Sequence, residues 1–231
     1  MTISKEEQDK FKMQAAHKAV EYVEDGMVVG LGTGSTVRFA IQRLADLMET
    51  EKMDIVGIPT SIETERLAKE LKIPLTDLKT HPDIDLTIDG ADEVDPSFTL
   101  IKGMGGALLR EKIVAVNTKQ QVIVIDYTKK VDILGTKSPL PVEVLPFGWA
   151  SCERALKDLG CSVTLRTKND KTVISDNNNY ILDCKFKSID NPEALESKIN
   201  NIPGVIENGL FINLTSTVIV ASPEGIEVLL R

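Results

Sequence analysis

The feature that most constrains the fold of this 231-residue chain is the alternation of short apolar runs with amphipathic stretches over its first half. A strand that is apolar throughout is buried on both faces, and strands separated by helices usually pair in parallel. The pattern therefore predicts an α/β fold with a mostly parallel sheet. We expect strands at 27–31, 55–58, 84–88 and 122–126, alternating with helices around 5–24, 37–47, 62–71 and 106–117.

After about residue 130 the pattern changes. Two prolines in the segment 138–141 mark a crossover that can separate two lobes. The elements beyond it follow the order βαββαβ, which is that of a ferredoxin-like split unit. We expect strands at 142–145, 162–166, 180–186 and 205–211 with helices at 149–159 and 191–200. Residues 217–221 and 226–230 are predicted to form two strands, or a strand and a short helix, that return to the first lobe.

Charge and targeting signals narrow the classes of function. The chain carries 27 basic and 35 acidic residues, a net charge of −8, which disfavours nucleic acid or an anionic membrane as a partner. The first 20 residues lack the apolar centre of a signal peptide, and no apolar run is long enough to span a bilayer. Three cysteines without CxxC spacing favour reduced thiols, so we expect a cytoplasmic protein.

A glycine-rich loop, Gly30-Leu31-Gly32-Thr33-Gly34-Ser35-Thr36, lies between an expected strand and a helix. Glycines let the backbone approach a ligand, and N–H groups at a helix start favour an anion. A tight turn whose Ser or Thr caps the helix explains the loop equally well.

A dinucleotide site is the obvious competitor for this loop, and two features disfavour it. Ser35 stands where the GxGxxG pattern needs its third glycine, and the second strand ends in Pro59-Thr60-Ser61 instead of an acid for the ribose. Asp54 lies at the wrong end of that strand. The loop suits a single phosphate better, and no GK[ST] follows it to make a Walker loop.

A run of four acids, Asp89-Gly90-Ala91-Asp92-Glu93-Val94-Asp95, follows an expected strand at the sheet edge where α/β proteins bind ligands. It can form a metal site, a polyol site or a solvated charged turn. The spacing does not match an EF-hand, and no histidine lies nearby for a transition metal. Carboxylates accept hydrogen bonds from sugar hydroxyls, but a charged turn is the commoner explanation of such a run.

The segment from Lys102 to Lys112, KGMGGALLREK, opens a helix with glycines that present backbone donors. Glu111 shares a helical stripe with apolar residues, which predicts partial desolvation and a raised pKa suited to a general base. A surface glutamate paired with its neighbours is the alternative. Only two histidines exist, so the available groups are carboxylates, lysines and backbone N–H groups. These suit proton transfer next to a carbonyl.

Together the motifs GLGTGST, DGADEVD and KGMGGALLREKIV, with DYTKKVDILGTKSPLPVEVL, resemble the signature of the A-type ribose-5-phosphate isomerases over nearly the full length. The resemblance implies a Rossmann-like lobe at 1–130 and 212–231 and a smaller ferredoxin-like lobe at 131–211. It implies interconversion of ribose 5-phosphate and ribulose 5-phosphate in the non-oxidative pentose phosphate pathway. The reaction would proceed through an enediolate without metal or cofactor, in a homodimer or homotetramer.

By the same resemblance, Glu111 is the general base that moves the proton between C1 and C2. Asp89 and Asp92 bind the reacting end of the opened sugar, and Lys102 supplies charge near the developing oxyanion. The remaining substrate-binding positions that the resemblance implies are Thr33, Gly34, Ser35, Thr36, Gly90, Ala91, Gly103, Met104, Gly105 and Lys129.

One departure from the family pattern is visible. Met104 interrupts a glycine run, so its backbone should avoid strongly positive φ, and its side chain can narrow the pocket edge. Three other functions compete with the isomerase. A sugar-phosphate sensor predicts a fused helix-turn-helix and tolerates loss of Glu111. An amino-sugar phosphate deaminase would call for a histidine near the site, and a coenzyme A transferase is a further enzyme on a similar fold.

Overall fold

The computed structural model describes residues 4–231, which form two compact units. Within the described part, the first unit comprises residues 4–91, Arg110–Lys129 and Leu214–Arg231, and the second comprises Asp92–Leu109 and Lys130–Asn213. Residues 1–3, which we assigned to the first lobe, lie outside the described part. The chain passes between the units at 91/92, 109/110, 129/130 and 213/214.

The first unit contains a six-stranded sheet in the order β15-β14-β6-β3-β1-β2. Every neighbouring pair is parallel except β14 and β15, so the mostly parallel sheet is confirmed and the last segment is a strand. The strands are β1 (Val28–Leu31), β2 (Val56–Pro59), β3 (Ile84–Gly90), β6 (Thr118–Asp126), β14 (Thr217–Ser222) and β15 (Gly225–Leu230).

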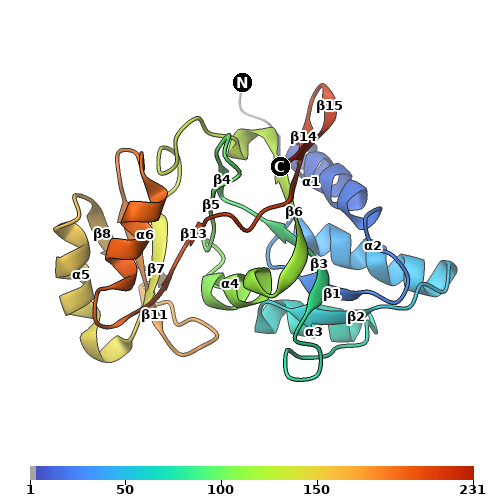
Figure 1. Ribbon diagram of the computed structural model, residues 1–231, viewed down its shortest axis with the longest axis horizontal. Helices are drawn as coiled ribbons and strands as arrows, with labels where there is room; N and C mark the ends of the chain where they lie inside the picture. Colours follow the sequence, from blue (N-terminus) through green and yellow to red (C-terminus); the bar gives the residue numbers. More distant parts are fainter. Residues whose placement is uncertain (1–3) are drawn as a thin grey trace. The chain divides into compact units, whose positions relative to one another are not determined.

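Helices cover both faces of this sheet (Figure 1). They are α1 (Lys5–Val20), α2 (Val37–Thr50), α3 (Ile62–Glu70) and α4 (Leu108–Val116), of which α4 belongs to this unit from Arg110 onward. Successive strand residues point to opposite faces: Val29 and Leu31 pack in the core cluster of α1 and α2, whereas Val28 packs with Val114 of α4. The side chain of Ser61 accepts a hydrogen bond from the Thr64 N–H at 3.0 Å and thereby caps the N-terminus of α3.

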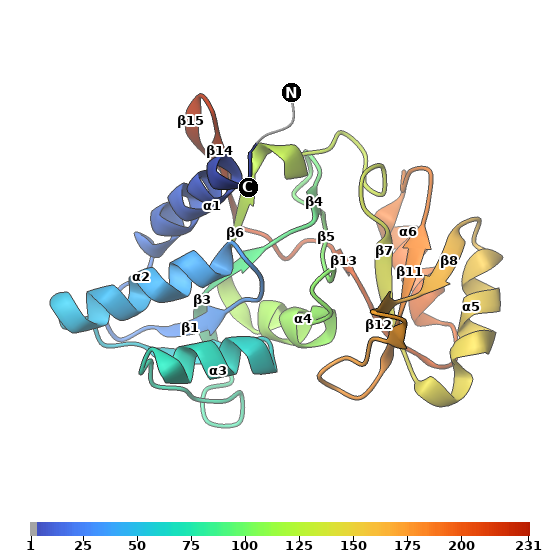
Figure 2. The ribbon, with the colours of Figure 1, turned by 180° about the vertical axis from the view of Figure 1, so that it is seen from behind.

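The second unit contains a four-stranded antiparallel sheet in the order β12-β7-β11-β8. Its strands are β7 (Leu140–Val144), β8 (Ser162–Leu165), β11 (Tyr180–Lys185) and β12 (Val205–Asn208). The helices α5 (Trp149–Lys157) and α6 (Pro192–Asn200) pack on the same face of it (Figure 2). Numbered along the chain, the strand order is 4-1-3-2 with βαββαβ connections, which is the expected ferredoxin-like arrangement.

The expected strand 205–211 is wrong as one element. It divides at Gly209 into β12 and β13 (Leu210–Phe211), and β13 joins a separate three-stranded sheet with β5 (Leu100–Ile101) and β4 (Glu93–Val94). This pairing is why the segment 92–109 groups with the second unit and not with the lobe that we had drawn around residues 1–130. A small hairpin of β9 (Thr167–Lys168) and β10 (Lys171–Thr172) was not expected either.

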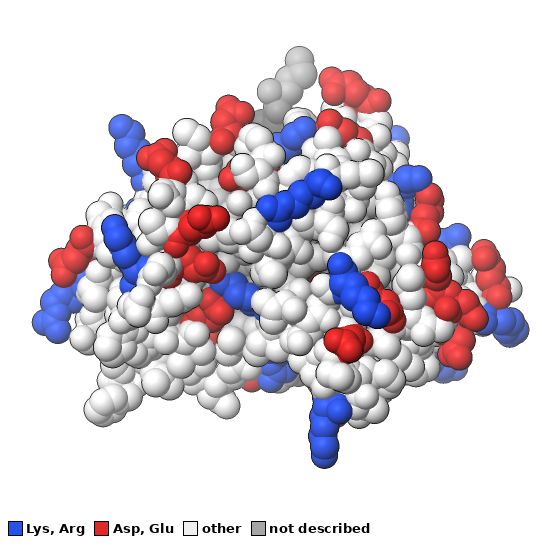
Figure 3. Space-filling model, viewed as in Figure 1, with Lys and Arg blue, Asp and Glu red and all other residues white. Residues whose placement is uncertain are grey.

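The structure also locates the cysteines and the charged side chains of the chain. Cys152, Cys161 and Cys184 are buried free thiols. Within residues 4–231 no helix is long and apolar enough to cross a membrane. On the face in Figure 3, basic side chains lie among acidic ones, and neither sign forms a continuous area there.

Candidate active site

In the first unit, two predicted site residues meet at the carboxyl ends of β1 and β3. Asp89, the penultimate residue of β3, is only 1% exposed. Its Oδ1 accepts hydrogen bonds from the backbone N–H groups of Thr33 at 3.1 Å and of Gly90 at 2.7 Å. Hydrogen bonding therefore joins the glycine-rich loop to Asp89, the first acid of the run 89–95, within this unit.

The glycines of this loop have separate physical reasons. A Cβ on Gly32 would lie 2.3 Å from the Asp89 Oδ1 and 2.6 Å from the Ile88 carbonyl oxygen, so no side chain fits there. Gly34 has open space around it but a φ of +115°, which side-chain-bearing residues rarely adopt. The lack of a side chain at Gly32 leaves room for the Asp89 carboxylate, and Gly34 can adopt the positive φ that the turn requires.

Three buried hydroxyl groups hold Thr33, and sequence reasoning assigned no functional role to any of them. The Thr33 Oγ1 lies 2.7 Å from the Thr60 Oγ1, 2.8 Å from the Ser61 Oγ and 3.3 Å from the Thr64 Oγ1. The Thr64 hydroxyl also donates to the Gly32 carbonyl at 2.8 Å. The residues after β2 thus order the loop, and the signal that could have found them is the run of hydroxyl side chains at 60, 61 and 64.

The hydroxyls at the start of α2 are not used as a cap. Thr36 occupies the N-cap position but makes no side-chain capping hydrogen bond, and its φ and ψ are helical. Ser35 is exposed, and Thr36 is half-buried. The side-chain cap of the turn interpretation is therefore wrong, and the anion-binding interpretation stays a prediction.

Two further predicted residues lie elsewhere in the first unit. Glu111, in the first turn of α4, is only 4% exposed, so the expected desolvated position on the helix is confirmed. Lys129 is half-buried at the end of the short 3₁₀ helix Tyr127–Lys129, directly after β6. Asp126 orders this turn, because its Oδ1 accepts the Thr128 N–H at 2.9 Å and the Thr128 hydroxyl as well.

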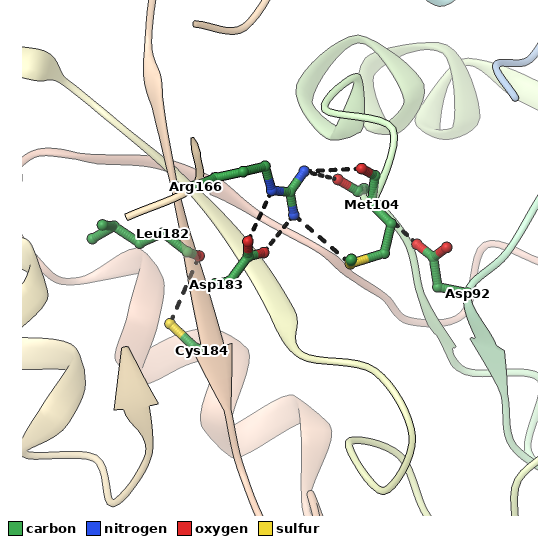
Figure 4. Close-up of polar contacts among 7 residues, drawn as sticks. Asp92, Met104, Arg166, Leu182, Asp183 and Cys184 are labelled. Atoms are coloured by element: carbon green, nitrogen blue, oxygen red, sulfur yellow. Dashed lines mark hydrogen bonds and ion pairs between the residues drawn. The ribbon is translucent and has the colours of Figure 1, made fainter. Parts of the chain in front are cut away.

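In the second unit, Asp92 contacts the glycine-rich segment. Its Oδ2 accepts a hydrogen bond from the Met104 N–H at 3.0 Å (Figure 4). Gly103 and Gly106 have φ of +104° and +84°, whereas Met104 is not among the residues with positive φ. The expectation for Met104 is confirmed: the methionine stands at a position of the glycine run whose backbone an L side chain can adopt.

Lys102 is buried in the second unit, only 2% exposed. Its backbone N–H donates to the Gly209 carbonyl at 2.9 Å, and its Nζ lies 5.3 Å from the centre of the Phe211 ring. An ammonium group over an aromatic face is favourable, and burial strengthens the attraction. The short strand β13 therefore helps to hold the cation in place.

The other two acids of the run 89–95 have structural roles, and the solvated-turn interpretation fails for Glu93. This carboxylate is fully buried and accepts backbone N–H groups from Gly135 at 2.6 Å, from Lys137 at 2.7 Å and from Ser138. Asp95 closes its own turn by accepting the N–H groups of Ser97 at 2.9 Å and Thr99 at 2.8 Å. Burial raises the pKa of Asp95, and these two hydrogen bonds oppose the shift.

The predicted residues thus fall into two sets. The first unit holds Thr33–Thr36, Asp89, Gly90, Ala91, Glu111 and Lys129, and the second holds Asp92 and Lys102–Gly105. In the described residues no group of three or more His, Cys, Asp or Glu side chains is arranged to hold a metal ion. The first unit carries the buried carboxylates of Asp89 and Glu111, and the second carries the buried ammonium group of Lys102. Buried ionisable groups of this kind are typical of α/β enzymes that use acid–base chemistry.

Comparison with known proteins gives the family. The model of the family ribose 5-phosphate isomerase A (phosphoriboisomerase A) matches residues 56–225. The chain is 53% identical over 222 residues to ribose-5-phosphate isomerase A of Gloeobacter violaceus, covering 96% of each chain. The enzyme of the same name from Desulfatibacillum aliphaticivorans is 53% identical over 221 residues, with 95% of this chain and 96% of that one covered. The chain belongs to the ribose-5-phosphate isomerase A family, a family of isomerases.

Solved structures agree with this assignment. A D-ribose-5-phosphate isomerase in complex with phospho-erythronic acid matches with a TM-score of 0.94 and 42% identity, over 96% of this chain and 99% of that one. Ribose 5-phosphate isomerase A of Methanocaldococcus jannaschii matches with a TM-score of 0.93 and 42% identity, over 97% and 100%. The fold is therefore shared over essentially the whole chain.

Proposed function

We propose that this chain interconverts D-ribose 5-phosphate and D-ribulose 5-phosphate through an enediolate, without a metal ion. The observation that carries the proposal is the buried carboxylate of Glu111 on α4, in a chain that belongs to a family of this name. A general base works best where water is excluded, because water otherwise solvates the carboxylate and competes for the proton. A carboxylate on the buried side of a helix is in such an environment.

The chemistry follows from the side chains available. Glu111 takes the proton from C2 of the opened aldose, the C2–H electron pair forms the C1=C2 bond, and O1 gains the negative charge. The protonated Glu111 returns the proton to C1 to give the ketose. Lys102 stabilises the developing oxyanion, and Asp89 and Asp92 bind the sugar oxygens and assist proton movement between them.

The remaining groups bind substrate in this proposal. Thr33, Gly34, Ser35 and Thr36 precede the N-terminus of α2, where backbone N–H groups favour an anion such as the phosphate. Lys129 adds a positive charge after β6. The segment Gly103–Gly105, with Gly90 and Ala91, lies against the sugar in this proposal. The Met104 and Gly90 N–H groups are already bonded to Asp92 and Asp89, so the Gly105 N–H is the donor that this segment offers.

The residues after β2 further weaken the dehydrogenase alternative. A dinucleotide site needs an acid there for the ribose, but Thr60 and Ser61 are buried and bonded to Thr33. The sensor alternative predicts that the base can be lost, and Glu111 is present and buried. Neither alternative explains the buried carboxylates as well as proton transfer does.

A related isomerase has been solved with phospho-erythronic acid. The planar carboxylate of such an acid resembles the enediolate, so we expect this chain to bind it more tightly than substrate. We further propose that the protein acts in the pentose phosphate pathway as a homodimer or homotetramer. Its three free, buried thiols suit a reducing cytoplasm.

The test is an assay of the purified chain, dialysed against a chelator, for conversion of ribose 5-phosphate to ribulose 5-phosphate. We expect full turnover after chelation and competitive inhibition by phospho-erythronic acid. Absence of turnover would overturn the proposed activity. Loss of turnover on chelation, with recovery on adding a divalent cation, would overturn the metal-free mechanism alone.

A further inference from the structure

Arg166 lies between β8 and β9 and has no role in the mechanism described above. Its backbone is fixed on both sides: its N–H donates to the Ile181 carbonyl at 2.9 Å, and its carbonyl accepts the Val173 N–H at 2.9 Å. Its guanidinium makes a two-pronged ion pair with Asp183 of β11, through Nε to Oδ2 at 2.9 Å and through Nη2 to Oδ1. The two side chains are 11% and 19% exposed, so the pair is largely shielded from water.

The third nitrogen of the same guanidinium reaches the glycine-rich segment. Nη1 donates to the Gly103 carbonyl at 2.8 Å and to the Met104 carbonyl at 3.1 Å. Nη2 also lies 3.8 Å from the Met104 Sδ. Figure 4 shows the guanidinium between the Asp183 carboxylate and the backbone of Met104, with Asp92 on the other side of that segment.

These contacts fix the direction of two peptide groups. In a trans peptide the C=O and the following N–H point in opposite directions. With the Gly103 carbonyl turned to Arg166, the Met104 N–H points to Asp92 and is bonded to its Oδ2 at 3.0 Å. With the Met104 carbonyl turned to Arg166, the exposed Gly105 directs its N–H away from the arginine, and among residues 4–231 this N–H has no hydrogen-bond acceptor.

We propose that Arg166, oriented by Asp183, is a positioning residue that aims the Gly105 N–H at an oxyanion of the sugar and holds Asp92 in place through Met104. The inference rests on the proposed isomerase function. A donor aimed in advance at a developing charge stabilises the transition state more than the ground state, so its loss lowers kcat with little change in KM. A guanidinium is needed because only its planar fork can pair with a carboxylate and reach two carbonyls at once.

The test compares Arg166→Lys with the unchanged chain. Lysine keeps the charge beside Asp183 but cannot span the carboxylate and both carbonyls. We expect kcat to fall about 10- to 100-fold, KM for ribose 5-phosphate to stay within about threefold, and inhibition by phospho-erythronic acid to weaken in proportion to kcat/KM. A substitution that only lowers stability would leave kcat, KM and the inhibition by phospho-erythronic acid unchanged in correctly folded protein.

Cys152→Ala is the matched control, because it truncates a buried side chain of α5 in the same unit without contacting Gly103 or Met104. We expect it to lower the melting temperature and leave kcat unchanged. If Arg166→Lys does not fold, Asp183→Asn replaces it, and we expect about a 3- to 10-fold lower kcat because the guanidinium keeps its carbonyl contacts but loses its charged partner.

The possible outcomes separate the two proposals. An inactive parent chain overturns the proposed function and the inference that rests on it. An active parent with kcat within about threefold in Arg166→Lys, or in Asp183→Asn where that variant is used, overturns the inference alone. Equal loss of kcat in the Cys152→Ala control would likewise overturn it, since stability would then account for the effect.

Discussion

Burial distinguishes the acids of the run 89–95 at the scale of single residues. Glu93 is fully buried, and three backbone N–H groups of the segment 135–138 surround its carboxylate. Asp89 is buried as well but binds the loop that we propose holds substrate. Two carboxylates four positions apart therefore have different roles, one in folding and one at the proposed site.

The residue whose loss should affect catalysis most is Glu111. In Glu111→Gln the side chain keeps its size and its polar end but can no longer accept a proton. We expect kcat for ribose 5-phosphate to fall at least about 10²-fold, measured at saturating substrate. Glu70→Gln, on α3 of the same unit, is the control and should retain full activity. Near-normal kcat in Glu111→Gln would remove this residue from the role of base.

Sequence reasoning found the buried position of Glu111 because its apolar helical stripe is visible along the chain. It did not connect the hydroxyl groups of Thr60 and Thr64 with Thr33, since they lie after β2 and in α3, 27 and 31 positions further along the chain. Nor could it find Arg166, which lies 62 positions after Met104 and is brought to it by the sheet. Patterns along the chain reveal which face a residue occupies but not which distant side chain it meets.

At the scale of elements, Asp85 links three strands of the parallel sheet. Its Oδ2 accepts the Val28 N–H of β1 at 2.9 Å, and its Oδ1 accepts the Lys119 ammonium of β6 at 2.8 Å. The hydrogen bond from Lys119, followed by the one from Val28, lowers the pKa of Asp85 below its ordinary value of 3.8. Asp85 itself lies on β3, between these two strands.

A pH-dependent stability follows from this carboxylate. Because its pKa is lower in the folded chain, its contribution is present above the unfolded pKa and is lost as pH falls through the folded value. We expect Asp85→Asn to lower the free energy of unfolding by about 1 kcal/mol at pH 7, with the difference shrinking below about pH 4. Urea unfolding across this pH range measures it, with the exposed Asp83→Asn as control. A difference that does not change with pH would contradict the assignment.

Most elements were predictable, and the exceptions share a cause. Long apolar or amphipathic runs such as β6 and α2 carry their own signal. The paired strands β4 and β5 have two residues each, too few to show any alternation. The run 205–211 shows continuous strand character, yet the chain changes its pairing partner from β7 to β5 around Gly209. A Cβ at this position would lie 2.2 Å from the Lys102 carbonyl oxygen, so only glycine fits here. That contact depends on a residue far earlier in the chain.

At the scale of the whole molecule, each unit is assembled from separate stretches of chain. The second unit needs Asp92–Leu109 as well as Lys130–Asn213. The first stretch supplies β5 as the partner of β13 and Glu93 as the acceptor for the segment 135–138. Our expected lobe boundary at 130/131 followed the change of pattern near residue 130 and the family resemblance, and it did not include a contribution from before that point.

The assembly of the second unit from two separate stretches of chain predicts which of its fragments can fold. A fragment of residues 130–213 should fold poorly, because β13 lacks its partner and three N–H groups lose the Glu93 carboxylate. Joining Asp92–Leu109 to this fragment through a flexible Gly/Ser linker should restore cooperative thermal unfolding. Circular dichroism, recorded as the temperature rises, measures the unfolding. The same joined fragment with Glu93→Ala is the control and should lose much of that gain, since it removes a buried acceptor of three hydrogen bonds. Equal melting of all three would contradict the division into units.

The pairing of β5 with β13 also has a consequence for synthesis. Ile101 pairs with Leu210, which a ribosome adds 109 residues later. At about 5–20 residues per second, β5 waits on the order of 5–20 s for its partner. The parallel sheet is completed later still, since β14 joins β6 only once residues 217–221 have emerged. Neither unit can close until nearly the whole chain has been made, so the nascent chain exposes unpaired strand edges for most of its synthesis and is an expected client of ribosome-associated chaperones.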